Sequence, residues 1–286
     1  MSWSLCADAD DFLEKRRKVL LADESSNCLA WAAIERSKLE GPDGDGYTFL
    51  TFDEAQASSA HAFIKVNGEE EHLVLGQMSP AQAEQLLGFV DSQGMSLGLV
   101  EGPREATQAF AQGWALTAGR SHRLQLNLGV YELTHVRRID LEGGRLCQAT
   151  EAHRELLTEY VIGFCCDCFP EQPIAREMID ARVTRFITQR RVYLWKTSDQ
   201  ELVAMAAMVR ESPNTASISW VYTPPSHRKK GYAARIVAAL SQAQLENGKR
   251  ACNLHTDLSN PTSNGVYRRI GYEKIAERIN VKLGHH

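Results

Sequence analysis

Two adjacent prolines after an apolar strand limit most strongly how this chain can fold. Residues 217–222 favour a strand, and Pro224 and Pro225 end it because neither proline can donate a hydrogen bond to a sheet. A basic stretch that contains a glycine follows at 226–233, and the apolar positions after it have helical spacing until Gly248. The sequence therefore predicts a strand, a tight loop and a helix in direct succession.

The start of this predicted helix is suited to hold an anion. The first N–H groups of a helix have no partner within the helix, and the helix dipole adds positive charge there. Arg228, Lys229 and Lys230 add to that charge, Gly231 allows close approach to the backbone, and Ala233 keeps the entrance small. A diphosphate fits this description. The pattern for a nucleoside triphosphatase is absent, and an ordinary solvated helix start would explain the loop alone equally well.

A second element makes the anion site more specific. Residues 251–257 favour a strand, and Asn260 with Pro261 supplies a cap and a first helical residue for a helix that ends at Gly271. On that helix Asn260, Asn264 and Tyr267 follow at i, i+4 and i+7, so they share one face. Two amides and a phenol in line are unusual for a face that packs into a core.

Composition and length indicate a globular protein with two domains. Apolar residues make up 43% of the 286 residues and charged residues 24%, which is ordinary globular usage, and domains average roughly 150 residues. The paired glycines within 140–144 favour a linker. We therefore predict one domain at 1–140 and a second at 141–286. The second contains an antiparallel meander at 192–196, 202–210 and 216–222.

Charge and residue usage argue against several classes of protein. The net charge of −4 gives no support for binding to nucleic acid. No apolar run is long enough to span a membrane, and the first residues do not look like a signal peptide, so we expect a cytoplasmic protein without membrane contact. The seven cysteines do not form a disulfide framework. Those at 165, 166 and 168 are expected to be buried or half-buried thiols rather than metal ligands.

The two motifs together resemble the GNAT superfamily of N-acetyltransferases. Residues 228–233 (RKKGYA) match the family's Gln/Arg-x-x-Gly-x-Gly/Ala loop. Residues 260–272 (NPTSNGVYRRIGY) match its Asn-x-x-Ser-Asn-x-x-Tyr-x-x-x-Gly-aromatic pattern, in the family's order. The resemblance covers about 145–283 and implies an α+β (α/β) fold with two GNAT-like domains, each a mixed, mostly antiparallel sheet flanked by helices. The first domain would be a divergent copy without cofactor motifs.

The resemblance also implies where acetyl-coenzyme A (acetyl-CoA) would bind. Its diphosphate would contact the amides of the basic loop, and its pantetheine arm would pair with the end of the preceding strand in a V between two strands. Either of the two asparagines would bind the arm from the other side. The implied cofactor-binding residues are Val221, Tyr222, Thr223, Arg228, Lys229, Lys230, Gly231, Tyr232, Ala233, Asn260 and Asn264.

Tyr267 matches the family tyrosine that protonates the departing thiolate. A phenol with a pKa of about 10 is protonated at neutral pH and can donate a proton to sulfur; a ring that only packs beside the cofactor is the alternative. The matched motifs fix no position for the general base. His255 and Asp257 lie on the strand beside the V, but residues in such places usually have structural roles.

The resemblance implies direct acetyl transfer in a ternary complex to a primary amine. The amine would be a small molecule or a peptide, no metal would be needed, and the protein would act as a monomer or homodimer. Two other hypotheses remain open at this point. One is a non-catalytic sensor that binds acyl-CoA or a protein partner, and the other is a nucleotide-binding module that uses the same basic loop.

Overall fold

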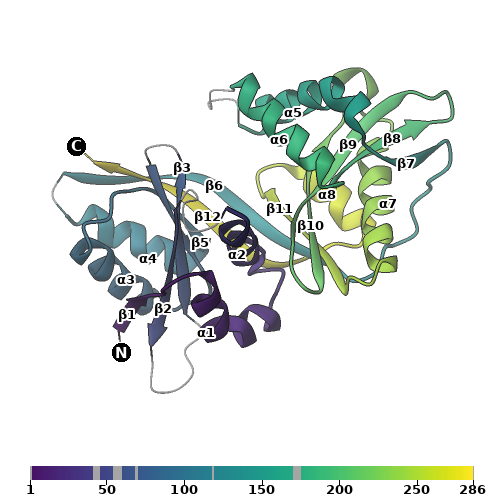
Figure 1. Cartoon of the computed structure of the whole chain (residues 1–286). Helices are drawn as coiled ribbons and strands as arrows, with labels where there is room; N and C mark the ends of the chain where they lie inside the picture. The colour runs from purple at the N-terminus through teal and green to yellow at the C-terminus, as the bar shows by residue number, and fades with distance from the viewer. Residues whose placement is uncertain are drawn as a thin grey trace. The chain divides into compact units, whose positions relative to one another are not determined.

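The chain folds into two compact units in a computed structural model that describes residues 2–40, 46–53, 60–67, 70–117, 119–169 and 175–285. Residues 1–130, 256–260 and 274–286 form the first unit, and residues 131–255 and 261–273 form the second. Each unit is seen as a sheet with helices in Figure 1. These units differ from a single division at residue 140, because two C-terminal segments belong to the first unit.

The first unit is built on a mixed sheet in the order β1-β2-β3-β4-β5-β12-β6. The first four strands pair antiparallel in succession, β4 and β5 run parallel, and β12 is antiparallel to β5. Its strands are β1 (Ser2–Leu5), β2 (Tyr47–Asp53), β3 (His61–Asn67), β4 (Glu70–Leu75), β5 (Leu97–Pro103), most of β6 (Arg120–Leu133) and of β12 (Glu273–His285). Its helices are α1 (Ala9–Ala22), α2 (Cys28–Glu40), α3 (Pro80–Ser92) and α4 (Arg104–Ala115).

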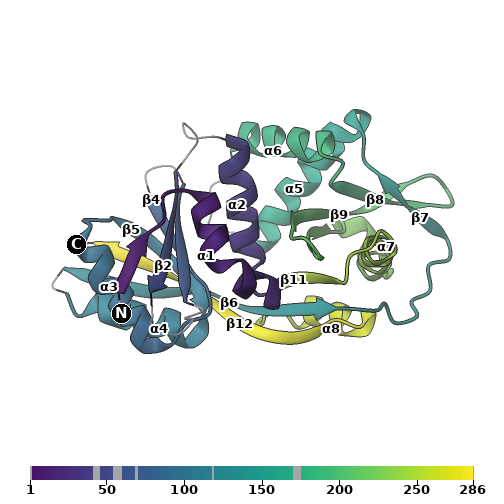
Figure 2. The same cartoon turned by 60° about the horizontal axis from the view of Figure 1, so that its bottom comes forward.

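Helices cover both faces of this sheet, as Figures 1 and 2 show. One core packs α3 and α4 against alternate residues of the strands, such as Leu73, Leu75 and Val100. The other packs α1 and α2 against the intervening residues, such as Phe63 and Val74. The period of two that a strand imposes on its side chains therefore divides the first unit into two apolar layers.

The second unit contains a five-stranded sheet in the order β11-β10-β9-β8-β7. The predicted meander is confirmed, because β8, β9 and β10 pair antiparallel, and β10 and β11 run parallel. Its strands are β7 (Gly144–Gln148), β8 (Val192–Thr197), β9 (Leu202–Glu211), β10 (Thr215–Tyr222) and β11 (Ala251–Asp257). Its helices are α5 (Arg154–Cys168), α6 (Arg176–Thr188), α7 (Tyr232–Glu246) and α8 (Pro261–Ile270).

The two strands that the sequence pattern did not predict are β1 and β12. β12 follows α8 along the chain, yet it pairs with β5, for example Asn280 with Glu101, and so completes the sheet of the first unit. Its alternating residues Ile279, Val281 and Leu283 enter the core below α3 and α4. The last strand of the chain is thus part of the N-terminal core.

Candidate functional site

The end of β10 carries a β-bulge that changes the direction of the backbone. Ser219 pairs with Ala207 of β9, but Tyr222 pairs with Met205, so β10 has one residue more than its partner strand between these pairs. Trp220 lies at this point with a φ of 54°, which is a rare conformation for a bulky residue. Its ring stacks on Phe186 of α6 with a centroid distance of 4.6 Å. Packing against α6 therefore holds the bulge in place.

β10 and β11 pair only over their first residues. The parallel ladder runs from Thr215–Ala251 to Ser217–Asn253, although β10 continues to Tyr222. The last pair is joined by buried side chains: Ser217 Oγ donates to Asn253 Oδ1 at 2.6 Å, and Asn253 Nδ2 donates to Thr215 Oγ1 at 3.2 Å. We call this point the fork. Beyond it the facing backbone groups of residues 218–222 are not used by β11.

The N-terminus of α7 has no side-chain cap. Gly231 is its N-cap residue, with a φ of 82° in the left-handed region, and the first turn of the helix contains no acidic residue. Lys229 also has a positive φ of 63°. A Cβ atom added to Gly231 would meet no atom within 4 Å. The first turn of α7 therefore begins beside basic residues with no side chain capping its amides, which suits an anion site.

Two arginines shape this loop through contacts that the sequence did not indicate. Arg228 donates to the Thr223 carbonyl at 3.0 Å and forms an ion pair with Asp167 of α5 at 2.5 Å. Its guanidinium lies 5.7 Å from the centroid of the Tyr222 ring. Arg235 donates to the Asp140 carbonyl at 3.1 Å and so joins α7 to the segment predicted as a linker. Lys229 and Lys230 are exposed.

The remaining predicted cofactor residues differ in exposure. Val221, Tyr222, Thr223, Tyr232 and Ala233 are partly buried, and Asn260 is exposed directly before α8. The Thr223 hydroxyl is buried, and no described residue forms a hydrogen bond with it. Asn264, in contrast, is only 3% exposed, and its Oδ1 accepts from the Tyr131 hydroxyl at 2.9 Å. Of the two asparagines, Asn260 is thus the exposed one.

Tyr267 lies on α8 and is partly buried. Its ring makes an edge contact with the Tyr272 ring at a centroid distance of 6.1 Å, and the Tyr272 hydroxyl is hydrogen-bonded to Ser241 Oγ at 2.8 Å. Burial raises the pKa of the Tyr267 phenol, and the nearby Cys168 thiol adds a smaller effect in the same direction. The phenol is therefore protonated at neutral pH and well above it, as a proton donor must be.

The two residues considered for the general base have different surroundings. Asp257 accepts a hydrogen bond from the Ser259 amide at 2.8 Å with its carboxylate, and its carbonyl accepts from the Asn260 amide at 3.1 Å. This turn gives Asp257 a structural role before α8. His255 is partly buried on β11.

The cysteines of α5 are more exposed than predicted. Cys165 is partly buried and packs against the apolar core of the second unit. Cys166 and Cys168 are exposed and are not part of this core. Among the described residues, no group of three or more histidine, cysteine, aspartate or glutamate side chains could hold a metal ion. No helix in the described ranges is both long and apolar enough to cross a membrane.

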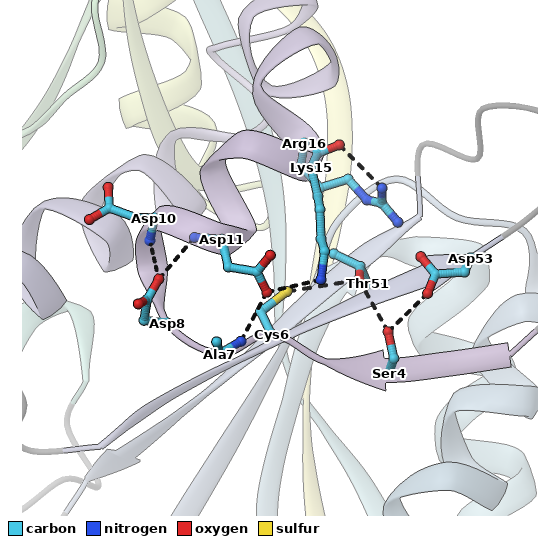
Figure 3. A network of polar contacts seen from close by, with 10 residues as sticks. All are labelled: Ser4, Cys6, Ala7, Asp8, Asp10, Asp11, Lys15, Arg16, Thr51 and Asp53. Atoms are coloured by element: carbon cyan, nitrogen blue, oxygen red, sulfur yellow. Dashed lines mark hydrogen bonds and ion pairs between the residues drawn. The ribbon is translucent and has the colours of Figure 1, made fainter.

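A polar network at the start of the first unit is structural (Figure 3). Asp8 caps α1 by accepting from the amides of Asp10 and Asp11, and Asp11 in turn accepts from the Ala7 amide at 2.9 Å. The Cys6 thiol donates to Thr51 at 3.8 Å, and burial raises its pKa. The network fixes the turn from β1 to α1, and its thiol is poorly reactive at neutral pH.

These elements together have the fold of acetyltransferases of the GNAT family. Three solved structures show this over nearly the whole chain. A GCN5-related N-acetyltransferase from Sphaerobacter thermophilus is 15% identical, with 99% of this chain and 95% of that chain covered and a TM-score of 0.64. A GNAT-family acetyltransferase from Colwellia psychrerythraea is 12% identical, with 99% of both chains covered and a TM-score of 0.58.

The third structure is itself a tandem protein. It is described as a tandem GNAT protein from the clavulanic acid biosynthesis pathway and is 13% identical, with 99% of this chain and 98% of that chain covered and a TM-score of 0.58. In sequence, residues 197–281 match the family model described as FR47-like protein, a range that includes the fork, the basic loop and α8. No curated protein sequence matches the chain.

Proposed function

We propose that the second half of the chain is an N-acetyltransferase that transfers acetyl from acetyl-CoA directly to a primary amine in a ternary complex. The observation that carries this proposal is the fork, which leaves residues 218–222 without a partner from β11 next to the uncapped helix α7. An extended chain can pair with such a strand end, and a diphosphate can bind at such a helix start. One molecule of acetyl-CoA has both parts.

The diphosphate end of the cofactor fits the loop at 228–233. The amides of Gly231, Tyr232 and Ala233 would hold the phosphate oxygens, because the first turn of α7 has no acidic residue and Gly231 has open space around it. Lys229 and Lys230 would add charge. Arg228 would act mainly by shaping the loop, because its guanidinium is already paired with Asp167 and Thr223.

The pantetheine arm fits the bulged end of β10. Backbone groups of Val221 and Thr223 would pair with its amides. The Thr223 hydroxyl at this strand end is buried, and no residue in the described part of the chain forms a hydrogen bond with it. From the other side the exposed Asn260 would donate or accept a hydrogen bond. Asn264 would instead support α8 through its bond to Tyr131.

Acetyl-CoA supplies an acetyl group activated as a thioester, and the chain supplies orientation and proton transfer. The bulge at Trp220 would turn the Val221 N–H toward the thioester carbonyl and so stabilise the negative charge that develops on its oxygen. The incoming amine nitrogen forms the new bond to the carbonyl carbon as the carbon–sulfur bond breaks. Tyr267 would donate its phenolic proton to the departing sulfur. The amine nitrogen would lose its proton to water, because no side chain is assigned as the general base, and Tyr267 would regain a proton from solvent.

The proposal gives the first half a different role. In the first unit the helix after the fourth strand is capped by its own side chains, so we infer that this half binds no acetyl-CoA and instead supports or shapes the acceptor site. The acceptor would be a small molecule or a peptide with a primary amine, and the protein would act without a metal as a monomer or homodimer.

Release of coenzyme A over a panel of primary amines tests the proposal. We expect turnover with at least one amine, and Tyr267→Phe should lower kcat by about 100-fold with the affinity for acetyl-CoA nearly unchanged. Tyr193→Phe is a matched control, because Tyr193 is a half-buried tyrosine of β8. Unchanged turnover in Tyr267→Phe would remove Tyr267 as the acid. Tight binding of acetyl-CoA without turnover on any amine would favour the sensor instead, and ready displacement by ATP would favour a nucleotide-binding module.

A further inference from the structure

A glycine inside α5 allows a tyrosine of β10 to approach the helix closely. Gly163 is an interior residue of α5, where glycine is less favourable than alanine because it loses more backbone freedom on folding. A Cβ atom added to Gly163 would lie 2.3 Å from the Tyr222 hydroxyl oxygen and 2.5 Å from Cζ of the same ring. Both distances are far shorter than a van der Waals contact. The Tyr222 ring can therefore take its place only because residue 163 has no side chain.

The Tyr222 ring has two further neighbours that limit its movement. The Tyr160 ring lies one helical turn before Gly163, with its centroid 5.6 Å from that of Tyr222, and the Tyr160 hydroxyl donates to the Leu202 carbonyl at 2.7 Å. The guanidinium of Arg228 lies 5.7 Å from the centroid of the Tyr222 ring. Because interiors are closely packed, a ring pushed away from α5 would displace one of these neighbours.

The same face of α5 also contacts the first residue of the basic loop. Tyr160, Gly163 and Asp167 follow at i, i+3 and i+7, so they share one face of the helix. Asp167 forms the ion pair with Arg228, and Arg228 donates to the Thr223 carbonyl at 3.0 Å. One face of α5 thus contacts both the end of β10 and the start of the loop that follows it.

We propose that Gly163 is a positioning residue for the binding of the diphosphate of acetyl-CoA, an inference that rests on the proposed function of the second unit. Gly163 would act through the Tyr222 ring, which supports the guanidinium of Arg228. Arg228 in turn would fix where the loop enters α7. A side chain at residue 163 would displace the ring and Arg228, and so weaken the contacts with the diphosphate. The fork is held separately by the buried bonds of Asn253, so the pantetheine arm should be affected little.

Two ligands test this inference on the full chain: acetyl-CoA by calorimetry, and S-acetylpantetheine, which lacks the diphosphate and the nucleotide, by NMR titration. Gly163→Ala should weaken the binding of acetyl-CoA by about tenfold and that of S-acetylpantetheine by less than about twofold. Gly88→Ala is the matched control, because Gly88 lies inside α3 and a Cβ atom there would meet no atom within 4 Å. It should leave both affinities unchanged. An equal loss for both ligands in Gly163→Ala would show a general disturbance of the fold and would overturn the proposal.

A double-mutant cycle shows whether Gly163 acts through Tyr222. Tyr222→Leu alone should weaken acetyl-CoA binding by about tenfold, because the support for Arg228 is lost. Gly163→Ala should then cause no further loss in the Tyr222→Leu background, since the overlapping ring is absent. A further tenfold loss in that background would overturn the proposal. Unchanged acetyl-CoA affinity in Gly163→Ala would overturn this inference alone, whereas a wild type that binds neither ligand would overturn the proposed function as well.

Discussion

The two halves of the chain have the same order of elements but differ at the point where a cofactor would enter. Each half runs strand, two helices, three strands, helix, strand, helix, strand: β1 to β6 in the first, β7 to β12 in the second. In the first half the parallel ladder of β4 and β5 reaches Val74–Glu101, beside the end of β4 at Leu75. In the second it stops at Ser217–Asn253, well before Tyr222. We call the β4–β5 ladder closed, because it runs nearly to the end of β4, and the β10–β11 ladder open, because it stops before the end of β10.

The helix after β4, α3, and the helix after β10, α7, also differ at their N-termini. Ser79 and Gln82 form a capping box at the start of α3, so the free amides there are used by the chain itself. Gly231 at the start of α7 offers no side chain. The β3–β4 ladder also has no register shift, whereas β10 has its bulge at Trp220. The comparison teaches that one fold can provide or withhold a cofactor site through a few local backbone features.

The largest expected effect comes from giving α7 an acidic N-cap. Gly231→Asp would place a carboxylate where the diphosphate is proposed to bind, and the affinity for acetyl-CoA should fall by about 100-fold. Calorimetry measures this change. Gly248→Asp is the matched control at the other end of α7, because Gly248 also has a positive φ of 94° and open space around it. Equal loss in both variants would contradict the anion site.

Removal of the side-chain hydrogen bonds at the fork should mainly lower the stability of the fold. Asn253→Ala removes the buried bonds to Ser217 and Thr215 and leaves their hydroxyl groups with fewer partners, so the free energy of unfolding should fall by about 2–3 kcal/mol. Urea denaturation measures this. Asn247→Ala, at the exposed end of α7, should change it by less than about 0.5 kcal/mol. A neutral Asn253→Ala would show that the network does not hold the fork.

Removal of the cap in the first half should have a smaller effect and should not create a site. Ser79→Ala breaks the capping box of α3 and should lower the free energy of unfolding by about 1 kcal/mol. Binding of acetyl-CoA per chain should not increase, because the β4–β5 ladder stays closed. A gain of a second binding event in Ser79→Ala would show that the cap alone separates the two halves.

The pH dependence should show no alkaline loss from Tyr267 in the usual range. The acid must be protonated to act, and burial raises the pKa of its phenol, so protonation persists beyond the pKa of about 10 of a free phenol. A profile of kcat from pH 7 to 10 checks this. An alkaline fall below pH 9 that disappears in Tyr267→Phe would assign the fall to Tyr267 and contradict the raised pKa of its phenol.

Much of this architecture follows from the sequence, because helices and strands follow apolar periodicity. The meander of β8 to β10, the stop before Pro224 and the start of α8 at Pro261 were predicted from such local signals. The pairing of β12 with β5 was not, since a strand's own residues do not specify its partner. No local sequence pattern predicted the bulge at Trp220 either. The positive φ of Trp220 depends on the packing of its ring on Phe186, which is distant in the sequence.

The sequence predicted the basic loop and α8 of the candidate site, but it did not predict the side-chain contacts that hold them in place. The basic residues and Tyr267 stand in motifs that can be read along the chain. The ion pair of Arg228 with Asp167 and the bond of Asn264 to Tyr131 join residues that are distant in sequence. Such contacts depend on the tertiary fold, so they decide which motif residues are free for a ligand and which are structural.

The most direct test of the difference between the halves is the stoichiometry of acetyl-CoA binding, measured by calorimetry on the full chain. The open fork and uncapped α7 predict one site per chain in wild type, and loss of that site in Gly231→Asp with no second site remaining. Two sites per chain, or one site that survives Gly231→Asp with unchanged affinity, would contradict the account.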